Sequence, residues 1–179
     1  MDGLENLRYP IGRFVRLTHP LDAAARSAAI ADLEQAPDNL RRLVAGLGDA
    51  QLETPYRPGG WTIRQVVHHV PDSHMNAYVR MKLAVTEDTP QIRPYEEGRW
   101  AELPEAKSAP IAMSLDLLAA LHRRWVAFLR ALPDQDFRRA FLHPEWGRVP
   151  LDEAIAMYAW HGRHHVAHVR QALASASRV

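Results

Sequence analysis

Histidine is the residue type in this sequence whose number and spacing point most directly to chemistry. The chain holds 10 histidines, and seven of them lie in two short windows, at positions 68, 69 and 74 and at 161, 164, 165 and 168. Imidazole nitrogens bind Zn, Ni, Cu and Fe, so the ligand type alone does not select the metal. Two windows far apart in the sequence indicate a metal site built from two elements that the fold brings together.

The second window places several imidazoles on one face of a helix. His161, His164 and His168 are spaced three and four residues apart, so they stack on one helical face. The pair His164 and His168 can reach one ion at Zn–N distances of about 2.0–2.1 Å. His161 and His165 are also four residues apart. This spacing predicts a metal-binding pair on the helix.

A third nitrogen would come from the first window, from His68 or His69, and the spacing does not choose between them. Three imidazoles leave a divalent ion with an open position, as in catalytic sites rather than closed structural ones. The alternative is a polar helix whose histidines are satisfied by ordinary hydrogen bonds. The clustering favours a metal because buried polar groups without partners cost free energy, and metal binding removes that cost.

Further residues are candidates for contacts around the ion. Asp72 lies three residues after His69 and could orient a ligand by a hydrogen bond, or it could be a surface acid. Arg64 and Arg163 could bind a substrate carboxylate in fork geometry, although surface positions are favoured for both in a chain so rich in arginine. Hydrolysis would need a general base, and since no His-Glu-x-x-His motif occurs, His165 or Asp72 would have to serve.

Four long helices must position these residues. Apolar residues recur every three or four positions in stretches that predict helices over residues 23–47, 63–85, 115–132 and 151–173. Capping residues stand before three of them: Asp22, Ser114, and Thr62 in a capping box with Gln65. Pro37 predicts a kink in the first helix or its division into two, and Pro71 predicts a bend in the second.

The remaining segments read as an arm and two long connectors. Residues 1–20 predict an extended arm lying on the body, and residues 86–110 predict a long irregular segment. Residues 133–150 form the second connector, in which Trp146-Gly147 predicts the turn of a short hairpin. Since no repeat or linker divides residues 1–179, we expect one domain, an all-α four-helix bundle with long crossover connections.

Composition excludes several classes of function. The net charge of +1 offers no basic excess for phosphates, so no nucleic-acid partner is expected. The chain has no cysteine, which excludes disulfides, a protein thiolate and every cysteine-ligated metal. No apolar run approaches the roughly 20 residues that cross a bilayer, and the first residues lack the charged and then apolar pattern of a signal peptide. We therefore expect a cytoplasmic protein without a membrane partner.

Several stretches are similar to the YfiT branch of the DinB-like superfamily. They are Tyr9-Pro-Ile-Gly12 and residues 54–76, 86–95 and 158–168, and the similarity covers nearly the whole chain. The resemblance implies a four-helix bundle of DinB/YfiT type, a homodimer and a three-histidine site for Zn or Ni. Members of this branch are described as metal-dependent hydrolases, and some are reported as bacillithiol S-transferases.

The resemblance also implies which histidines bind the ion. The first ligand corresponds to His69, the second residue of the His-His pair. The other two correspond to His164 and His168, the pair that closes the His-His-x-x-His run. His161 and His165 are then expected to be neighbours of the site and not ligands.

Three functions stay open on the sequence. The first is transfer of a low-molecular-weight thiol to an electrophile such as an epoxide or an alkyl halide, by a metal-activated thiolate that Arg64 or Arg163 could help to hold. The second is hydrolysis by metal-activated water, ranked lower because the glutamate used by zinc proteases is missing. The third is a non-catalytic, metal-binding stress protein, which three protein ligands and an open site make less favoured.

Overall fold

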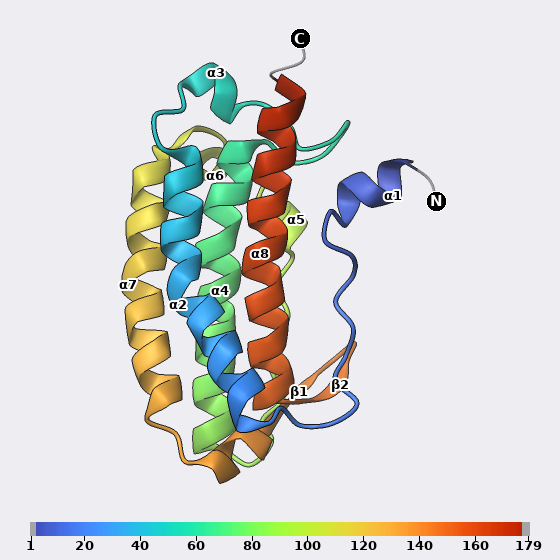
Figure 1. Ribbon diagram of the computed structural model, residues 1–179, viewed down its shortest axis with the longest axis vertical. Coiled ribbons are helices and arrows are strands. Elements are labelled where there is room, and N and C mark those ends of the chain that lie inside the picture. Colours follow the sequence, from blue (N-terminus) through green and yellow to red (C-terminus); the bar gives the residue numbers. More distant parts are fainter. Residues whose placement is uncertain (1–2, 177–179) are drawn as a thin grey trace.

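Four long helices packed side by side form the framework of the computed structural model, which describes residues 3–176 (Figure 1). They are α2 (Ala23–Val44), α4 (Ile63–Thr86), α7 (Ile111–Arg130) and α8 (Leu151–Ala176). Helices α2 and α4 each pack against both α7 and α8. The predicted four-helix bundle is confirmed. Within the described residues, no helix is long and apolar enough to cross a membrane.

The connections give the bundle a crossover. Figure 1 shows α4 and α7 running in one direction and α2 and α8 in the other. Because α4 and α7 are parallel neighbours, residues 87–110 must return along the bundle before α7 begins. The shorter elements are α1 (Gly3–Arg8), α3 (Asp49–Leu52), α5 (Glu97–Trp100), α6 (Pro104–Ser108), the 3-10 helix η1 (Asp134–Arg138), β1 (Ala140–His143) and β2 (Gly147–Pro150).

Two of the four long helices begin at the capping residues predicted from the sequence. The Asp22 carboxylate accepts a hydrogen bond of 2.7 Å from the Ala25 amide at the start of α2. Thr62 and Gln65 form the expected reciprocal capping box at the start of α4. Ser114 was expected to cap the third helix, but α7 begins at Ile111, after Pro110, and Ser114 lies inside it. Proline is tolerated at a helix start because the first amides of a helix have no carbonyl partner within it, so the missing N–H of proline costs no hydrogen bond.

The two internal prolines do not interrupt their helices. Pro37 lies within the continuous helix α2, so the predicted division into two helices is wrong, and Pro71 lies within α4. Proline removes the hydrogen bond to the carbonyl four residues earlier, and tertiary packing must offset that loss. For Pro37 the carbonyl left without its helical donor is that of Leu33.

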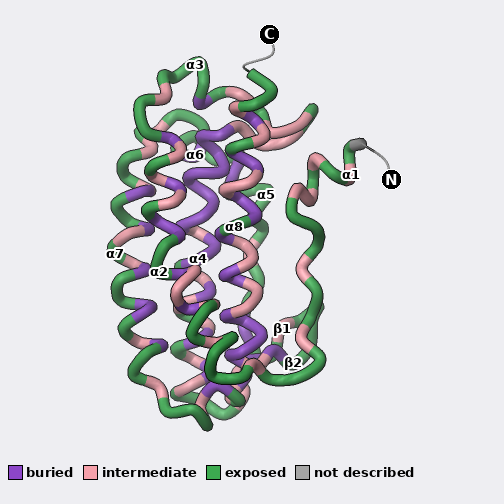
Figure 2. The backbone as a smooth tube through the Cα atoms, viewed as in Figure 1, coloured by how far each residue is buried: buried purple, intermediate pink, exposed green. Residues whose placement is uncertain are grey.

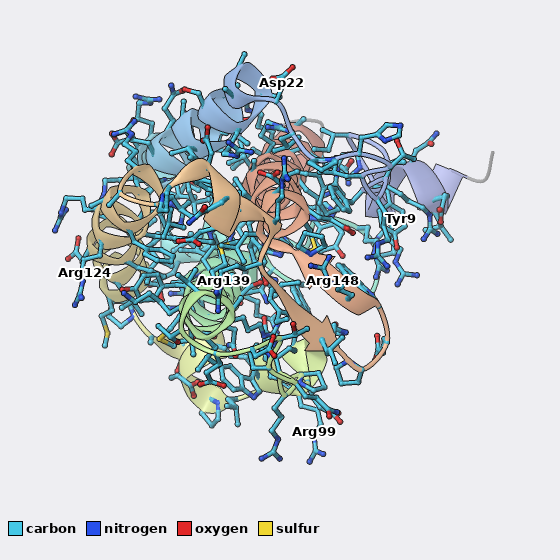
Figure 3. The ribbon with its side chains drawn as sticks, turned by 90° about the horizontal axis from the view of Figure 1, so that it is seen from below. Tyr9, Asp22, Arg99, Arg124, Arg139 and Arg148 are labelled. Carbon is cyan, nitrogen blue, oxygen red and sulfur yellow. The ribbon has the colours of Figure 1, made fainter. Side chains whose placement is uncertain are left out.

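The hairpin and the arm lie on one side of the bundle. Strands β1 and β2 pair antiparallel, with the predicted turn at Gly147, whose φ of 68° suits glycine. After α1, which the sequence did not indicate, the arm runs extended beside α8. Arg16 on the arm bonds Glu153 of α8 at 2.5 Å and the Trp146 carbonyl at 2.6 Å. Figure 3 places Tyr9 and Arg148 on the side opposite α7.

The core consists of two apolar clusters, one at each end of the bundle. One includes Leu33, Met81, Trp125 and Ile155, and the other includes Leu40, Val67, Leu118 and Val169. Figure 2 shows the buried segments on the inward sides of the helices. Between the clusters lies a set that we call the histidine layer, made of His69, His74, His122, His161 and His165.

Candidate metal centre

Three histidines of this layer bring their ring nitrogens together. His69 on α4 and His161 and His165 on α8 each offer a ligand atom, and these atoms all lie within 4.8 Å of one another. The Nε2 atom of His161 is 3.4 Å from that of His69 and 3.2 Å from that of His165. Nitrogens about 2.0–2.1 Å from one ion in a tetrahedral arrangement stand about 3.3 Å apart. The separations therefore fit a metal ion.

The helices explain this convergence. His161 and His165 are one turn apart on α8, so both side chains project from the same face toward α4. His69 meets them from α4, which packs directly against α8. The indole of Trp61, just before α4, covers His69 with a ring-centre distance of 4.7 Å. Two packed helices and one loop thus hold the three imidazoles.

The expected ligand set differs from this group in two members. His69 belongs to it, but His161 and His165 stand where His164 and His168 were expected. His164 stacks on Trp160 at 4.4 Å between ring centres, and His168 stacks on Tyr56 at 3.9 Å. The reason is helical rotation, since a shift of three residues turns a side chain by about 60° around the axis.

Burial keeps the imidazoles of the site neutral. Desolvation, followed by the neighbouring His168, lowers the pKa of His69 to about 4. Desolvation and the adjacent histidines also lower the pKa of His161 and of His165 well below the ordinary value. Desolvation lowers the pKa of His164 to about 3. Neutral imidazole is the form that binds metals, so the group is ready to bind at neutral pH.

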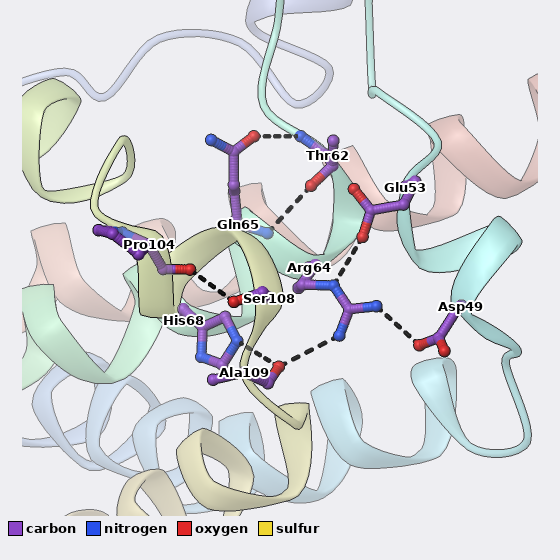
Figure 4. A network of polar contacts seen from close by, with 9 residues as sticks. All are labelled: Asp49, Glu53, Thr62, Arg64, Gln65, His68, Pro104, Ser108 and Ala109. Atoms are coloured by element: carbon purple, nitrogen blue, oxygen red, sulfur yellow. Dashed lines mark hydrogen bonds and ion pairs between the residues drawn. The ribbon is translucent and has the colours of Figure 1, made fainter.

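Arg64 has a structural position away from this site. Its guanidinium bonds Glu53 at 2.6 Å, Asp49 at 2.8 Å and the Ala109 carbonyl at 3.1 Å (Figure 4). The neighbouring His68 also bonds the Ala109 carbonyl, at 3.1 Å. These contacts fasten α3 and the segment before α7 onto the start of α4. The expected role of Arg64 as a substrate clamp is therefore not supported.

Arg163 and Asp72 also lie outside the histidine group. Arg163 forms an ion pair with Asp32 of α2 and is not among the residues that line the pocket described below. Asp72 is half-buried, and desolvation, followed by the charge of Glu105, raises its pKa to about 6. It too is absent from the pocket lining. For both residues the structure agrees with the alternative left open on the sequence, a position outside the site.

A pocket of about 560 Å³ contains the three histidines in its wall. Its other walls come from the arm, the loop before α4, residues 94–98 and the hairpin. Arg8, Arg57 and Arg80 line it together with Glu97 and Glu145. Within residues 3–176, none of these three arginines forms an ion pair with a carboxylate. The pocket thus offers positive charge beside the histidines.

Unpartnered polar atoms gather in the same pocket. In the described part of the chain, the buried side-chain atoms without a hydrogen-bond partner are Arg57 Nε, Trp160 Nε1 and His164 Nδ1. All three residues line this pocket. Buried polar groups are normally hydrogen-bonded, so these three atoms are the polar groups of the pocket that a ligand could contact. Sequence reasoning missed Arg57, whose only signal was its place in the loop before the first histidine window.

Comparisons with known proteins show which family and which solved structures this chain resembles. A model of the DinB superfamily matches residues 32–169. A Bacillus cereus (strain 03BB102) protein named "Putative metal-dependent hydrolase" is 50% identical over 166 residues, which are 93% of this chain and 95% of that protein. A Bacillus thuringiensis subsp. konkukian (strain 97-27) relative with the same description has the same identity and coverage.

Two solved structures share the fold. YfiT from Bacillus subtilis, described as "a probable metal-dependent hydrolase with an unusual four-helix bundle topology", superposes with a TM-score of 0.93. It is 46% identical, and the match covers 96% of this chain and 98% of that one. TT2238, a four-helix bundle protein, has a TM-score of 0.54 and 23% identity over 79% of this chain and 94% of that one. The second match supports the fold alone.

Proposed function

Because this chain belongs to the DinB superfamily, we propose that it is a metal-dependent enzyme in which His69, His161 and His165 hold one divalent ion. The reaction that this site supports best is transfer of a low-molecular-weight thiol, of the bacillithiol type, to an electrophile. The observation that carries this choice is the ligand group itself. Within the described residues this group holds three imidazoles and lacks the glutamate that zinc proteases place between their histidine ligands, and three ligands leave an open position that a thiol can fill.

A divalent ion at this site would lower the pKa of a thiol and so supply a thiolate at neutral pH. In transfer to an alkyl halide, the sulfur–carbon bond forms, the carbon–halogen bond breaks, halide leaves and the thiol proton passes to solvent. The protein residues have three tasks in this reaction: they keep the imidazoles neutral, exclude water and hold the cosubstrate. The buried histidines and the aromatic walls of the pocket suit the first two.

The third task falls to the arginines of the pocket. Arg8, Arg57 and Arg80 suit a cosubstrate that carries carboxylates, because guanidinium groups bind carboxylates with two parallel hydrogen bonds. Arg57 is the strongest candidate since its buried Nε has no partner among the described residues. His164 Nδ1 offers a second polar contact for the bound molecule. These residues replace Arg64 and Arg163 as the proposed clamp.

Cobalt substitution tests the proposal. We expect Co(II)-loaded protein to show visible bands and, on addition of a low-molecular-weight thiol, a near-ultraviolet charge-transfer band. His161→Ala should lose the cobalt bands, whereas His164→Ala, one turn away on the same helix and itself buried, should keep them. The reverse pattern would restore the expected set of His69, His164 and His168. Visible bands that no thiol alters would remove the thiol hypothesis.

Hydrolysis is the second candidate, favoured by the names of the relatives. His164 would then accept the proton of the attacking water through its free Nδ1. Zn-loaded protein should cleave an activated ester without any thiol, and His164→Ala should slow that cleavage while retaining the metal. Equal ester cleavage by the wild type and by His161→Ala would exclude this reaction.

The resemblance supports three further proposals. We propose Zn or Ni as the ion, a homodimer as the assembly and the cytoplasm as the location. Metal analysis of protein purified without added metal tests the first, and light scattering at micromolar concentration tests the second. A monomer by light scattering would contradict the dimer.

A further inference from the structure

A line of hydrogen bonds leads from the proposed ligand His161 across the whole bundle. His161 Nδ1 is 3.0 Å from Nε2 of His74 on α4, and His74 Nδ1 is 2.7 Å from Nε2 of His122 on α7. His122 Nδ1 is 2.5 Å from the carbonyl oxygen of Leu33 on α2. His74 is 0% and His122 is 1% exposed, so water does not compete for these bonds. The line joins all four long helices at one level.

The last acceptor in this line is made available by a proline. In a regular helix the Leu33 carbonyl would accept the amide hydrogen of residue 37. That residue is Pro37, which has no amide hydrogen. The buried carbonyl therefore lacks its helical donor, and His122 supplies the hydrogen instead. Pro37 leaves this carbonyl without a helical donor, and His122, 85 positions away in the sequence, donates to it.

The carbonyl fixes the direction of every bond in the line. A carbonyl only accepts, so the His122 Nδ1 atom must carry hydrogen and its Nε2 atom must accept. His74 Nδ1 then donates and its Nε2 accepts, which requires His161 Nδ1 to donate. Three neutral rings have three hydrogens, and all three are used in three bonds. The His161 Nε2 atom keeps its lone pair, at the point where the three ligand nitrogens converge, and its one hydroxyl neighbour, Ser73 Oγ, is 3.5 Å away.

We propose that His74 and His122 are positioning residues that hold His161 in the Nδ1–H tautomer, with its Nε2 lone pair directed at the ion. The inference rests on the proposed metal site. Ligating histidines commonly donate their other ring hydrogen to a partner that fixes the ring and raises its basicity. In this protein the partner is another histidine, whose own orientation is set by a third histidine and a backbone carbonyl.

The second ligand of α8 is held in the same way. His165 Nδ1 lies 3.4 Å from His168 Nδ1, and His168 Nε2 lies 3.1 Å from the Arg8 carbonyl oxygen. The carbonyl again accepts, so His168 carries hydrogen on Nε2 and accepts from His165 Nδ1. The Nε2 lone pair of His165 is thereby free for the ion. His168, expected from the sequence to be a ligand, becomes the positioning residue of His165.

Nitrogen-15 NMR of histidine-labelled protein tests the tautomers directly. In the wild-type chain loaded with Zn(II), we expect His74 and His122 to carry hydrogen on Nδ1 and His168 to carry it on Nε2. Free histidine in water prefers hydrogen on Nε2, so the pattern for His74 and His122 is not the default. The same spectrum of metal-free protein should show His122 unchanged. Hydrogen on Nε2 of His122 or His74 would overturn the inference.

Metal affinity gives a second readout. His74→Leu should weaken Zn(II) binding by about 10- to 100-fold, the range for loss of a group that orients a ligand. His68→Leu is the matched control, because His68 lies on the same helix, is 7% exposed and bonds Ser114 and Ala109 outside this line. Competition with a coloured chelator measures both variants. Equal affinities of the two variants would contradict the positioning role of His74.

The two measurements separate the inference from the proposed function. A wild-type chain that binds no divalent ion refutes the proposed metal site, and it refutes the role of His74 in metal binding with it. A wild-type chain that binds Zn(II) tightly but shows the opposite tautomers supports the metal site and refutes the positioning role. Should His74→Leu not fold, the wild-type spectra still decide, because they need no variant.

Discussion

His161 and His165 lie one turn apart on α8, and their Nε2 atoms are 3.2 Å from each other. Together with a third nitrogen from α4, these two ring nitrogens form the proposed metal site, which metal-binding experiments test directly.

Loss of His165 should abolish tight metal binding. We expect His165→Ala to weaken the affinity for Zn(II) by more than about 100-fold, beyond the effect of losing an outer partner. Isothermal titration or chelator competition measures the change. His164→Ala is the control, since it alters the neighbouring residue on the same helix and leaves the converging nitrogens intact. A larger loss in His164→Ala than in His165→Ala would contradict the proposed ligand set.

Arg57 should select the charge of the thiol. We expect Arg57→Gln to raise KM for a thiol with carboxylates by about 10- to 100-fold, because a hydrogen bond to a charged group contributes about 1.5–3 kcal/mol. The KM for an uncharged thiol should change little. Steady-state rates with both thiols measure the difference. Arg64→Gln provides the comparison, as Arg64 is absent from the pocket lining. Equal effects on both thiols would mean that Arg57 does not bind the carboxylates.

Acid should destabilise the metal-free protein below pH 6.5. Burial lowers the pKa of His122 to about 4 in the folded state, whereas the unfolded chain takes up this proton near pH 6.5. Between these values the unfolded state binds more protons, so the free energy of unfolding falls as the pH falls. The slope from His122 approaches about 1.4 kcal/mol per pH unit. Above pH 6.5 the His122 ring is neutral in both the folded and the unfolded state, so its contribution to the slope vanishes.

Urea unfolding from pH 7 to pH 4 in the presence of a chelator measures this slope. His122→Leu should show a shallower dependence than the wild type over the same range. Identical slopes for the two proteins would show that His122 does not stay neutral in the folded state.

Arg26 should be important for stability because it neutralises a buried acid. Its guanidinium bonds Asp152, whose side chain is 2% exposed, at 2.7 Å. It also bonds Asp134, whose side chain is 90% exposed. We expect Arg26→Ala to lower the free energy of unfolding by about 3–5 kcal/mol, since it leaves a buried carboxylate without its partner. Asp134→Ala should cost less than about 1 kcal/mol. Urea unfolding at pH 7 compares the two.

The helices could be predicted because their signals are local. Asp22 and the Thr62–Gln65 box are short-range capping patterns, and the hairpin turn needed only Gly147. The prediction of Ser114 as a cap was wrong because its hydroxyl forms a different bond, of 2.7 Å, to His68 Nδ1. Pro37 misled because a proline inside a helix is tolerated when tertiary packing and a new donor offset the lost bond.

The choice among the histidines needed the helix face as well as the spacing. Both pairs on α8 are four residues apart, so spacing could not separate them. Burial does not separate them either, because His164, His165 and His168 are all buried on α8 while His161 is half-buried. Only the packing of α8 against α4, which brings His69 to His161 and His165, identifies the face with the converging nitrogens. The contacts of His74 with His122 and His161 could not be predicted, because these partners come from other helices.

The histidine layer also determines how the four helices are aligned. Helices in purely apolar contact can slide by one turn and still bury a similar area. Here a slip of α7 along α4 would separate His122 from both His74 and the Leu33 carbonyl. Each stranded polar group would cost about 1–3 kcal/mol. The layer thus fixes the register of the helices between the two apolar clusters, as a buried polar residue does in a coiled coil.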